Sequence, residues 1–347
     1  MAWTSATRMW RSVLKKPTSA KQLLRLSLLR WAGVACAAVL FGCVPLACRP
    51  RSSPVMAASA GPTIPRPAAD EFSVMTYNLR LYGYEDRDGD GQAKNPKPDD
   101  ERLAVLDVLA AARPDVLAVQ EMGNHDFFDG FRSELKARGL DYPHAVYLHR
   151  GQHQANLALL SRFPITSQTL HTNDQYSMGS AKLKVLRGFL DATIQVTPTY
   201  SFRIMVAHLK SKVFNKFGQT EMRRNEARLL NNHVRAALKE NPDLQLVVLG
   251  DLNDAPESAA LHEAKGERTR CLEDVRPADP LGDVWTYYSA LLDQYERIDY
   301  ILVSHAMQAN VVREKTLAVR HPQTLQGSDH RPVMAVFKTR NSAATKP

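Results

Sequence analysis

The sequence predicts a layered α/β protein (α+β class) whose sheets are mixed rather than purely parallel. Short uninterrupted apolar runs indicate strands buried on both faces, and segments with apolar residues at helical spacing separate several of them. Two of the runs, at 189–196 and 202–207, are joined through Thr197-Pro198-Thr199 and indicate a hairpin. Because hairpins occur alongside single strands, a purely parallel sheet is excluded.

Strand and helix patterns alternate along the chain from residue 71. A strand at 72–78 comes first, and a helix beginning at Asp99 then places Leu103, Leu106 and Ala110 on one apolar face. This helix ends at Arg113-Pro114-Asp115, since proline disfavours helical backbone in the residue before it. The remaining predicted elements are a strand at 116–120, a short helix at 127–138, a strand at 157–160, the hairpin, a long helix at 219–239, and strands at 246–249, 298–303 and 333–337.

Polar residues stand at the ends of many predicted strands, which is where α/β proteins build sites. Each also fits a simpler interpretation, such as a turn, a cap or a solvated strand end. Asp299 lies between Ile298 and Tyr300 inside an apolar run, where a carboxylate has to be paired or bound. The set comprises Asn78, Gln120, Glu121, His208, Asp251, Asn253, Asp299, Asp329 and His330.

The distribution of charge separates an N-terminal leader from the rest of the chain. The 347 residues carry a net charge of +9, but all of the excess lies before residue 61, where nine basic residues and no acidic residue occur. The remainder is balanced, so any attraction to phosphate has to come from local patches. No internal repeat is visible, and we expect one domain over residues 71–340.

Residues 1–48 have the pattern of a signal peptide or an N-terminal membrane anchor, with a basic segment ahead of an apolar run at 31–48. Leu40-Phe41-Gly42-Cys43 resembles a bacterial lipobox with Cys43 as the lipidated residue; cleavage after Ala60 and an uncleaved anchor are the alternatives. A Pro/Ala/Ser-rich linker spans 49–70. Because more positive charge precedes the run than follows it, we expect an exported domain, secreted or anchored to the bacterial cell envelope.

Six segments, taken in chain order, resemble the endonuclease/exonuclease/phosphatase superfamily, of the deoxyribonuclease I type. Together they extend from about residue 71 to 338. They are Met75-Thr76-Tyr77-Asn78, Asp115-Val116-Leu117-Ala118-Val119-Gln120-Glu121, Val206-Ala207-His208-Leu209-Lys210, Val248-Leu249-Gly250-Asp251-Leu252-Asn253, Arg297-Ile298-Asp299-Tyr300-Ile301-Leu302 and Gly327-Ser328-Asp329-His330-Arg331-Pro332.

This resemblance implies a four-layer sandwich, in which two mixed β-sheets pack face to face and helices cover them. It also implies hydrolysis of phosphodiester bonds that depends on Mg²⁺, for which Mn²⁺ is a substitute. Glu121, with Asn78 beside it, is similar to the direct metal ligand of the family, and Asp329 is expected near the metal. Carboxylate and amide oxygens suit such a hard cation.

Catalytic roles carry over in the same way. Asp251 would orient or deprotonate the attacking water, and Asn253 would hold that water or a phosphate oxygen. His330 would contact the phosphate, with Asp299 fixing its ring, and His208 would stabilise charge on the phosphoryl group or serve the leaving oxygen. Positioning and charge neutralisation account for most of the catalysis in such reactions.

A nucleic acid is the expected substrate, DNA or RNA. Lys210 and Lys212 follow His208 closely, Trp285 precedes the strand of Asp299, and Asn156 is similar to an active-site Asn of the family. Phosphatase activity and a sphingomyelinase-like phospholipid phosphodiesterase are the alternative enzymes, and a non-catalytic binding domain is a third alternative. We expect a monomer, with a membrane as partner only through the N-terminal segment.

Asp86, Asp88 and Asp90 have the spacing of the start of a calcium loop, with Gly91 following. The twelfth position is Lys97, where an EF-hand has a bidentate Glu. An EF-hand is therefore disfavoured, and a weak Ca²⁺ site and a solvated acidic turn stay open. A framework of disulfides is excluded, because Cys271 is alone beyond the leader.

Overall fold

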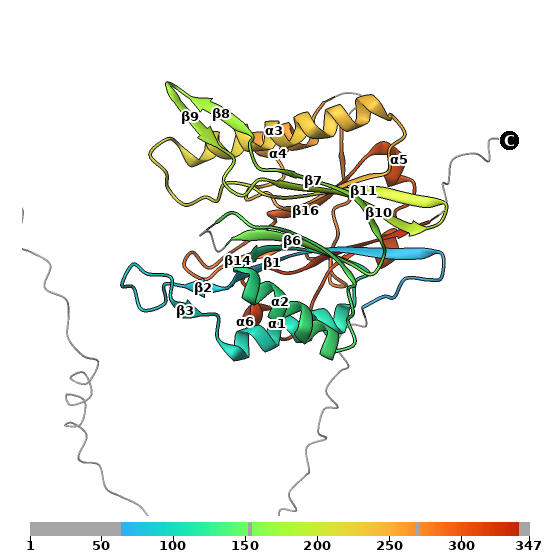
Figure 1. Cartoon of the computed structure of the whole chain (residues 1–347), viewed down its shortest axis with the longest axis horizontal. Helices are drawn as coiled ribbons and strands as arrows, with labels where there is room; N and C mark the ends of the chain where they lie inside the picture. Colours follow the sequence, from blue (N-terminus) through green and yellow to red (C-terminus); the bar gives the residue numbers. More distant parts are fainter. Residues whose placement is uncertain (1–63, 152–154, 268–270, 340–347) are drawn as a thin grey trace, which may run out of the picture. The chain divides into compact units, whose positions relative to one another are not determined.

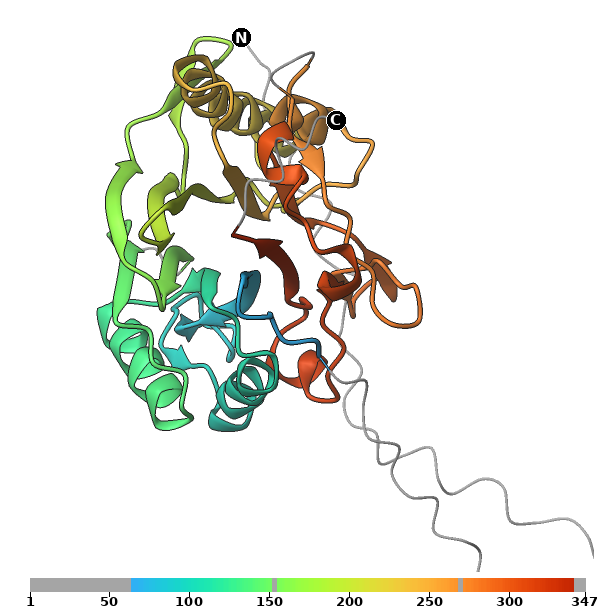
Figure 2. The same cartoon turned by 90° about the vertical axis from the view of Figure 1, so that its right-hand side faces the viewer.

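The computed structural model describes residues 64–151, 155–267 and 271–339. Within these ranges, two sheets pack against each other and helices cover their outer faces, as Figures 1 and 2 show. This arrangement confirms the predicted sandwich of two mixed sheets. The predictions for residues 1–48 and for the linker up to residue 63 lie outside the described residues. Among the helices described, none has the length and apolar character of a membrane span.

The first sheet holds the N-terminal and C-terminal strands of the domain side by side. β1 (Glu71–Tyr82) runs parallel to β4 on one side and antiparallel to β18 on the other. Within the described residues the strand order is β17 (Leu317–Ala318), β18 (Val333–Lys338), β1, β4 (Val116–Met122), β6 (Asn156–Ser161) and β5 (His144–Leu148).

The second sheet contains the predicted hairpin, which is formed by β10 and β11 and pairs antiparallel with Phe189 opposite Ala207. β11 runs parallel to β12, and the other pairs are antiparallel. Within the described residues the strand order is β13 (Glu273–Asp274), β16 (Asp299–Val303), β12 (Leu246–Asp251), β11 (Tyr200–His208), β10 (Phe189–Thr197) and β7 (Ile165–His171).

Helices and short hairpins complete the layers. The described helices are α1 (Asp99–Ala112), α2 (His125–Ala137), α3 (Gln219–Glu240), α4 (Ala259–Lys265), α5 (His305–Gln308), the 3₁₀ helix η2 (Arg313–Lys315) and α6 (Thr324–Gly327). The described hairpins are β2 (Tyr84–Glu85) with β3 (Asn95–Pro96), β8 (Gln175–Met178) with β9 (Ala181–Lys184), and β14 (Tyr287–Ser289) with β15 (Gln294–Glu296).

Three apolar cores hold the four layers together. One lies between the sheets, and Phe72, Phe202 and Phe337 meet there with ring centroids 4.9–5.6 Å apart around Phe72. A second joins the first sheet to α1 and α2, and a third joins the second sheet to α3 and α4. Burial of so many aliphatic side chains on both faces of each sheet explains why the strands read as uninterrupted apolar runs.

Several local predictions for α1 and its neighbours differ from the structure. α1 ends as expected, at Arg113 in a left-handed conformation before Pro114. The acidic residues at its start make no side-chain cap, and Leu103, predicted on the buried face, is exposed. The strand at 165–171 was missed because its side chains are mostly exposed and form no apolar run.

Candidate active site

The alternation of side chains along β1 decides which polar residue faces the space between the sheets. Phe72 and Val74 belong to the inter-sheet core, whereas Met75 and Tyr77 pack beneath α1. Since successive side chains point to opposite faces, Asn78 shares the face of Phe72 and points between the sheets. It lies at the end of the buried part of the strand, where the apolar core gives way to polar groups.

Three adjacent strands of the second sheet place polar residues on the corresponding face. His208 of β11 is in register with Asp251 of β12, which is in register with Asp299 of β16. All three side chains are buried. The residue two positions from each along its strand belongs to the inter-sheet core: Val206, Leu249 and Ile301.

Glu121 is turned toward this group by an irregularity in β4. Strict alternation would place it with Val119 on the helix-covered face, but its backbone is left-handed at φ 62°, and the strand register shifts between Val119 and Met122. A bulge of this kind re-aims a side chain, at a cost of about 1–3 kcal/mol. The amide of Leu81 donates to Glu121 Oε2 at 2.9 Å, which fixes the carboxylate.

Asp251 is the centre of the arrangement. Its Oδ2 accepts a hydrogen bond from Asn78 Nδ2 at 3.0 Å and lies 3.4 Å from His208 Nε2 and 3.9 Å from His330 Nε2. Burial and the charge of Asp299 raise the pKa of Asp251, partly offset by His330. A carboxylate with a raised pKa is a better proton acceptor near neutral pH.

His330 is the best-defined histidine of the site. The predicted partner is present, with His330 Nδ1 2.8 Å from Asp299 Oδ2, and the ring of Tyr287 lies 4.9 Å from the imidazole. Burial alone would lower the pKa of His330, but Asp299, Asp251 and Asp329 outweigh it and raise the pKa. We expect a protonated imidazole that donates through Nε2.

Arg331 anchors the loop that carries His330. It is among the largest fully buried side chains, and its guanidinium donates to Asp279 Oδ2 at 2.9 Å and lies 4.3 Å from the ring of Trp285. Ser328 donates to the carbonyl of Asn78 at 2.8 Å. The loop is therefore fixed to β1 and to the segment between β13 and β14, and its histidine is positioned by packing and hydrogen bonds.

His208 differs from His330 in its protonation. Burial, then the charges of Arg187, His330 and Lys210, lower its pKa well below the usual value, so the imidazole is neutral. Its Nε2 lies 3.7 Å from Glu121 Oε1, and its buried Nδ1 has no hydrogen-bond partner within the described part of the chain. A neutral imidazole between two carboxylates fits a donor to a phosphoryl or leaving oxygen.

Asn253 is reached through a backbone turn that begins at Gly250. Gly250 has φ +137°, and a Cβ there would lie 1.9 Å from the carbonyl oxygen of Ala207. The chain then bends so that Asp251 Oδ1 accepts from the amide of Asn253 at 2.8 Å. Asn253 itself is left-handed at φ 56°, and its side chain donates to Leu209 O at 3.0 Å. Close pairing of β11 with β12 requires glycine here.

Oxygen atoms that could bind a divalent cation are concentrated among the side chains just described. Glu121 Oε1 and Asp251 Oδ2 are both bonded to Asn78 Nδ2, at 3.3 and 3.0 Å, and the buried Asp299 Oδ1 has no partner in the described residues. Among those residues, Asp251, Asp299 and His330 also offer ligand atoms within 4.8 Å of one another. Such an oxygen-rich set fits a hard cation such as Mg²⁺. We call the whole group the strand-end cluster: Asn78, Glu121, His208, Asp251, Asp299 and His330.

Asp329, predicted near the metal, stands at the rim of the strand-end cluster. Its Oδ1 lies 3.9 Å from His330 Nε2 and its Oδ2 lies 4.0 Å from Arg80 Nε, and about a third of its side chain is exposed. Its carbonyl accepts from the amide of Tyr288 at 2.9 Å. Its role toward a metal stays a prediction.

The predicted substrate residues are mostly engaged in holding the fold. Lys210 Nζ donates to the carbonyls of Ser211 and Val213, and Lys212 is paired with Glu296. Both polar atoms of the Asn156 side chain bond to backbone, since Nδ2 donates to the carbonyls of Met122 and Gly123 and Oδ1 accepts from Arg150. Trp285 is half-buried, with the guanidinium of Arg331 4.3 Å from its ring. The roles of these residues toward a substrate stay predictions.

The acidic loop of Asp86, Asp88 and Asp90 closes on itself. Asp86 accepts from the amides of Gly89, Asp90 and Gly91, and Lys94 pairs with Asp88 and Asp90. The residue at the twelfth position, Lys97, is buried and donates to the carbonyl of Arg80 at 3.0 Å. The loop is the exposed tip between β2 and β3. Its three carboxylates offer ligand atoms within 4.8 Å of one another, so both the weak Ca²⁺ site and the solvated acidic turn stay predictions.

Arg187 is a residue of the site that sequence reasoning missed. Its Nη1 donates to the carbonyl of Leu209 at 3.0 Å, and its charge contributes to the lowered pKa of His208. It precedes β10, which runs antiparallel to β11, so the beginning of one strand lies at the end of the other. A search for polar residues just before the first residue of each predicted antiparallel strand would have included Arg187.

Two comparisons with known sequences bear on the family of the chain. The model of the Endonuclease/Exonuclease/phosphatase family matches residues 75–330. No curated protein matches the chain.

Solved structures similar to this one share the fold at low identity. The human Nocturnin catalytic domain with bound sulfate is 19% identical, with a TM-score of 0.58, and the match covers 79% of this chain and 97% of that one. Truncated TDP2 of Caenorhabditis elegans is 19% identical, with a TM-score of 0.55, and the match covers 77% and 98%. A Staphylococcus aureus beta toxin is 17% identical, with a TM-score of 0.53, and the match covers 76% and 99%.

Proposed function

Because the chain belongs to the endonuclease/exonuclease/phosphatase family, we propose that it is a divalent-metal-dependent phosphodiesterase and that its substrate is a nucleic acid. The observation that carries this proposal is the position of Asp251, whose Oδ2 is bonded to Asn78 and lies 3.4 Å from His208 and 3.9 Å from His330. One buried carboxylate surrounded by potential hydrogen-bond donors on three other segments is a site for activating water beside a phosphate.

Glu121 and Asn78, with Asp329 at the rim, would hold the metal ion. Their oxygen atoms suit Mg²⁺, and Mn²⁺ prefers similar ligands. When bound, such an ion neutralises the charge of the phosphate and polarises it toward attack. The buried Asp299 Oδ1, which lacks a partner among the described residues, agrees with a site that has room for a further positive group.

The protein's own residues account for the proton transfers and for binding the phosphate. Asp251 accepts a proton from the water whose oxygen attacks phosphorus, while the bond from phosphorus to the leaving oxygen breaks. His330, protonated and held by Asp299, donates a hydrogen bond to a non-bridging oxygen. His208 is placed to donate to the phosphoryl group or to the leaving oxygen, which takes up a proton as it departs.

Two exposed segments beside the strand-end cluster support a nucleic acid as substrate. Phe214 is 81% exposed in the segment that follows His208, and Lys216 lies near it in the sequence. Tyr295 is 55% exposed and stacks on Tyr288 at 4.6 Å in the β14–β15 hairpin. Exposed aromatic faces with nearby cations are typical of surfaces that bind single-stranded nucleic acid.

A phospholipid is the second candidate, because the same two segments also expose aliphatic side chains. Leu291 is 93% exposed and Leu292 60% exposed between β14 and β15, and Val213 is 71% exposed. The Lys212–Glu296 ion pair joins the two segments. Clustered apolar tips would suit an enzyme that meets its substrate at a lipid surface.

A substrate panel with Mg²⁺ or EDTA tests the proposal. Plasmid DNA, single-stranded DNA, RNA, sphingomyelin vesicles and an inositol phosphate are incubated with the purified domain, and we expect cleavage of a nucleic acid that EDTA abolishes. His330→Ala should abolish it too, whereas His305→Ala, at a position 95% exposed on α5, should not change it. Cleavage of sphingomyelin with nucleic acids untouched would reject the nuclease and favour the second candidate.

Variants of the two exposed segments separate the candidates further. Removing a stacking ring by Phe214→Ala should raise KM for a single-stranded oligonucleotide by about tenfold, since one base stack is worth about 1–3 kcal/mol. Leu291→Ser with Leu292→Ser should leave that KM within about twofold. The opposite pattern, together with weaker binding to vesicles, would contradict a nucleic-acid surface.

A further inference from the structure

A second group of potential metal ligands lies on the helix-covered face of the second sheet. His171 ends β7, Asp174 lies in the loop before β8, and His233 is on α3. Each offers a ligand atom, and the three atoms lie within 4.8 Å of one another. We call these residues the His171 cluster. It is separate from the strand-end cluster, because β7 and α3 contribute no residue to the latter.

The three side chains are already arranged around a common point. The imidazole rings of His171 and His233 stack with centroids 3.8 Å apart and an interplanar angle of 29°. His233 Nε2 lies 2.9 Å from Asp174 Oδ2. The side chains are 18%, 20% and 25% exposed for His171, Asp174 and His233, so solvent can reach them but the fold restrains them.

A buried carboxylate holds the ring of His171 from behind. Asp191 Oδ2 lies 3.2 Å from His171 Nε2, and Arg203 donates to both carboxylate oxygens of Asp191 at 2.8 and 2.6 Å. Burial would raise the pKa of Asp191, but the bonds from Arg203 and His171 lower it, so the group stays a carboxylate. Metal-binding histidines commonly donate their second nitrogen to such a carboxylate, which fixes the tautomer and the ring.

The alternative interpretation is that these residues form ordinary His–Asp ion pairs at the surface, which does not account for the stacking of the two imidazole rings. A single His–Asp pair would explain His233 with Asp174, but it gives no reason for a second imidazole stacked on the first at 3.8 Å. If both rings were protonated, their charges would repel at this distance. An ion that binds one nitrogen of each ring and the carboxylate requires both rings to be neutral, and the rings have to turn from their stacked arrangement to direct both nitrogens at it.

We propose that His171, Asp174 and His233 bind a divalent transition-metal ion, for which Zn²⁺ is the best fit. Two imidazole nitrogens and one carboxylate oxygen are typical zinc ligands, and water would complete a four-coordinate site. Mg²⁺ prefers an all-oxygen set and would not compete well here. The two clusters therefore select different ions.

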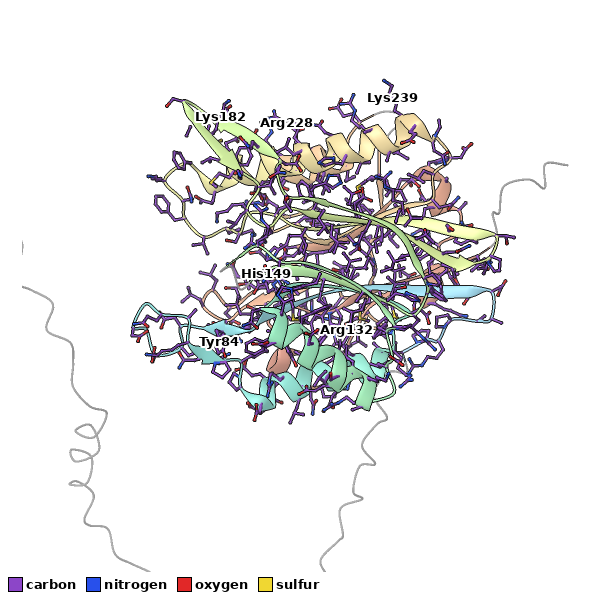
Figure 3. All side chains as sticks on the ribbon, viewed as in Figure 1. Tyr84, Arg132, His149, Lys182, Arg228 and Lys239 are labelled. Atoms are coloured by element: carbon purple, nitrogen blue, oxygen red, sulfur yellow. The ribbon has the colours of Figure 1, made fainter. Side chains whose placement is uncertain are left out.

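The bound ion would fasten the β8–β9 hairpin to the body of the domain. The carbonyl of Asp174 accepts from the amide of Val185 at 3.0 Å, so both ends of the hairpin meet at the cluster. Figure 3 shows Lys182 of this hairpin and Arg228 of α3 extending outward on the same side of the molecule. From Val185 the chain continues to Arg187, which bonds to Leu209 beside His208. The site is thus a structural clamp near, but outside, the strand-end cluster.

Zinc titration in excess Mg²⁺ tests the proposal, because Mg²⁺ competes for the oxygen ligands of the strand-end cluster and the variants below identify zinc held by the His171 cluster. Calorimetry should give one Zn²⁺ per chain, and saturating Zn²⁺ should raise Tm by about 5 °C or more. Co²⁺ in place of Zn²⁺ should give visible absorption typical of nitrogen ligands. His233→Ala and Asp174→Asn should each weaken binding at least about 100-fold and remove the shift in Tm.

Matched variants distinguish zinc held by the His171 cluster from zinc held elsewhere on the chain. His262→Ala, at an exposed position of α4 outside both clusters, should leave zinc affinity unchanged. Asp191→Asn should weaken binding by about 10–100-fold while all three ligands remain. Circular dichroism without metal shows whether each variant is folded; if His233→Ala is not, His233→Gln replaces it. Equal zinc affinity in wild type and in folded variants at 174 and 233, or no zinc-dependent Tm shift in wild type, would overturn the proposal.

Discussion

The strand-end cluster and the His171 cluster both bring histidines against carboxylates, but they balance charge differently. Behind the His171 cluster, the buried carboxylate of Asp191 has Arg203 as a direct partner at 2.6 Å. In the strand-end cluster, no Lys or Arg among the described residues forms an ion pair with Glu121, Asp251 or Asp299. Among the described residues their partners in this respect are two histidines, His330, which is protonated, and His208, which is neutral.

This difference indicates what each cluster requires. Burying carboxylates that outnumber their one protonated partner, His330, is costly, and a hard divalent cation is a natural counter-charge for an oxygen-rich group. Behind the His171 cluster the buried Asp191 is compensated by Arg203, and the cluster itself offers imidazole nitrogens, which suit a softer ion. Under the two proposals, similar residue types serve catalysis in one place and a structural role in the other.

The largest expected effect is on activity and tests whether the two clusters are independent. Asp251→Asn removes the proton acceptor at the centre of the strand-end cluster and should lower kcat by about 10³-fold or more. The zinc-dependent rise in Tm should persist. Phosphodiester hydrolysis and a thermal melt measure the two effects.

The exposed Asp243→Asn serves as the control and should retain full activity. A loss of less than tenfold in Asp251→Asn would remove Asp251 from the catalytic centre. Loss of the zinc effect in the same variant would show that the two clusters are coupled.

A smaller effect, on stability, distinguishes the geometry of the strand-end cluster from its chemistry. Gly250→Ala would place a Cβ 1.9 Å from the carbonyl oxygen of Ala207 and should lower the free energy of unfolding by about 3 kcal/mol. Gly130→Ala, inside α2 with no atom within 4 Å of the new Cβ, should raise it by about 0.5–1 kcal/mol. Urea denaturation measures both, and equal effects would contradict a steric requirement at Gly250.

The smallest effect concerns Glu226, a buried carboxylate with neither histidine nor arginine bonded to it in the described structure. Its Oε2 accepts a hydrogen bond from the backbone amide of Lys210 at 2.7 Å, and burial raises its pKa to about 7. Between about pH 4.5 and 7 the folded state therefore binds a proton on Glu226 that the unfolded state has lost. The stability that this proton contributes is lost as the pH rises through this window.

Glu226→Gln should remove that slope. Urea denaturation at pH 5 and pH 8 should show wild type losing about 2 kcal/mol more than the variant over this range. Equal pH dependence of the two proteins would contradict this prediction. It would mean that ionising Glu226 costs the folded state no stability.

Much of the strand-end cluster was predictable because it follows from buried strands. Asn78, His208 and Asp251 end apolar runs and Asp299 interrupts one, and alternation then decides which face they share. Glu121 was predicted by its family motif, but its direction depends on a left-handed backbone and a bulge, which no periodicity reveals. Similarly, the partners of Lys210 could not be anticipated, because a loop folds back on its side chain.

The His171 cluster was missed for a different physical reason. His171 ends a strand with exposed side chains, Asp174 is in a loop and His233 is on a helix, so no sequence spacing joins them. Only the packing of α3 on the second sheet brings them together. Ligands that come from three kinds of element leave no local pattern, whereas residues at strand ends do.

The place of β18 has a consequence for when the enzyme can act during its synthesis. This strand lies between β17 and β1, so the last strand of the domain completes a sheet whose first strand carries Asn78. Asp299, His330 and the buried anchor Arg331 all reach the fold with this final segment. A chain still held by the ribosome therefore has an incomplete strand-end cluster until its C-terminal strand has emerged and docked.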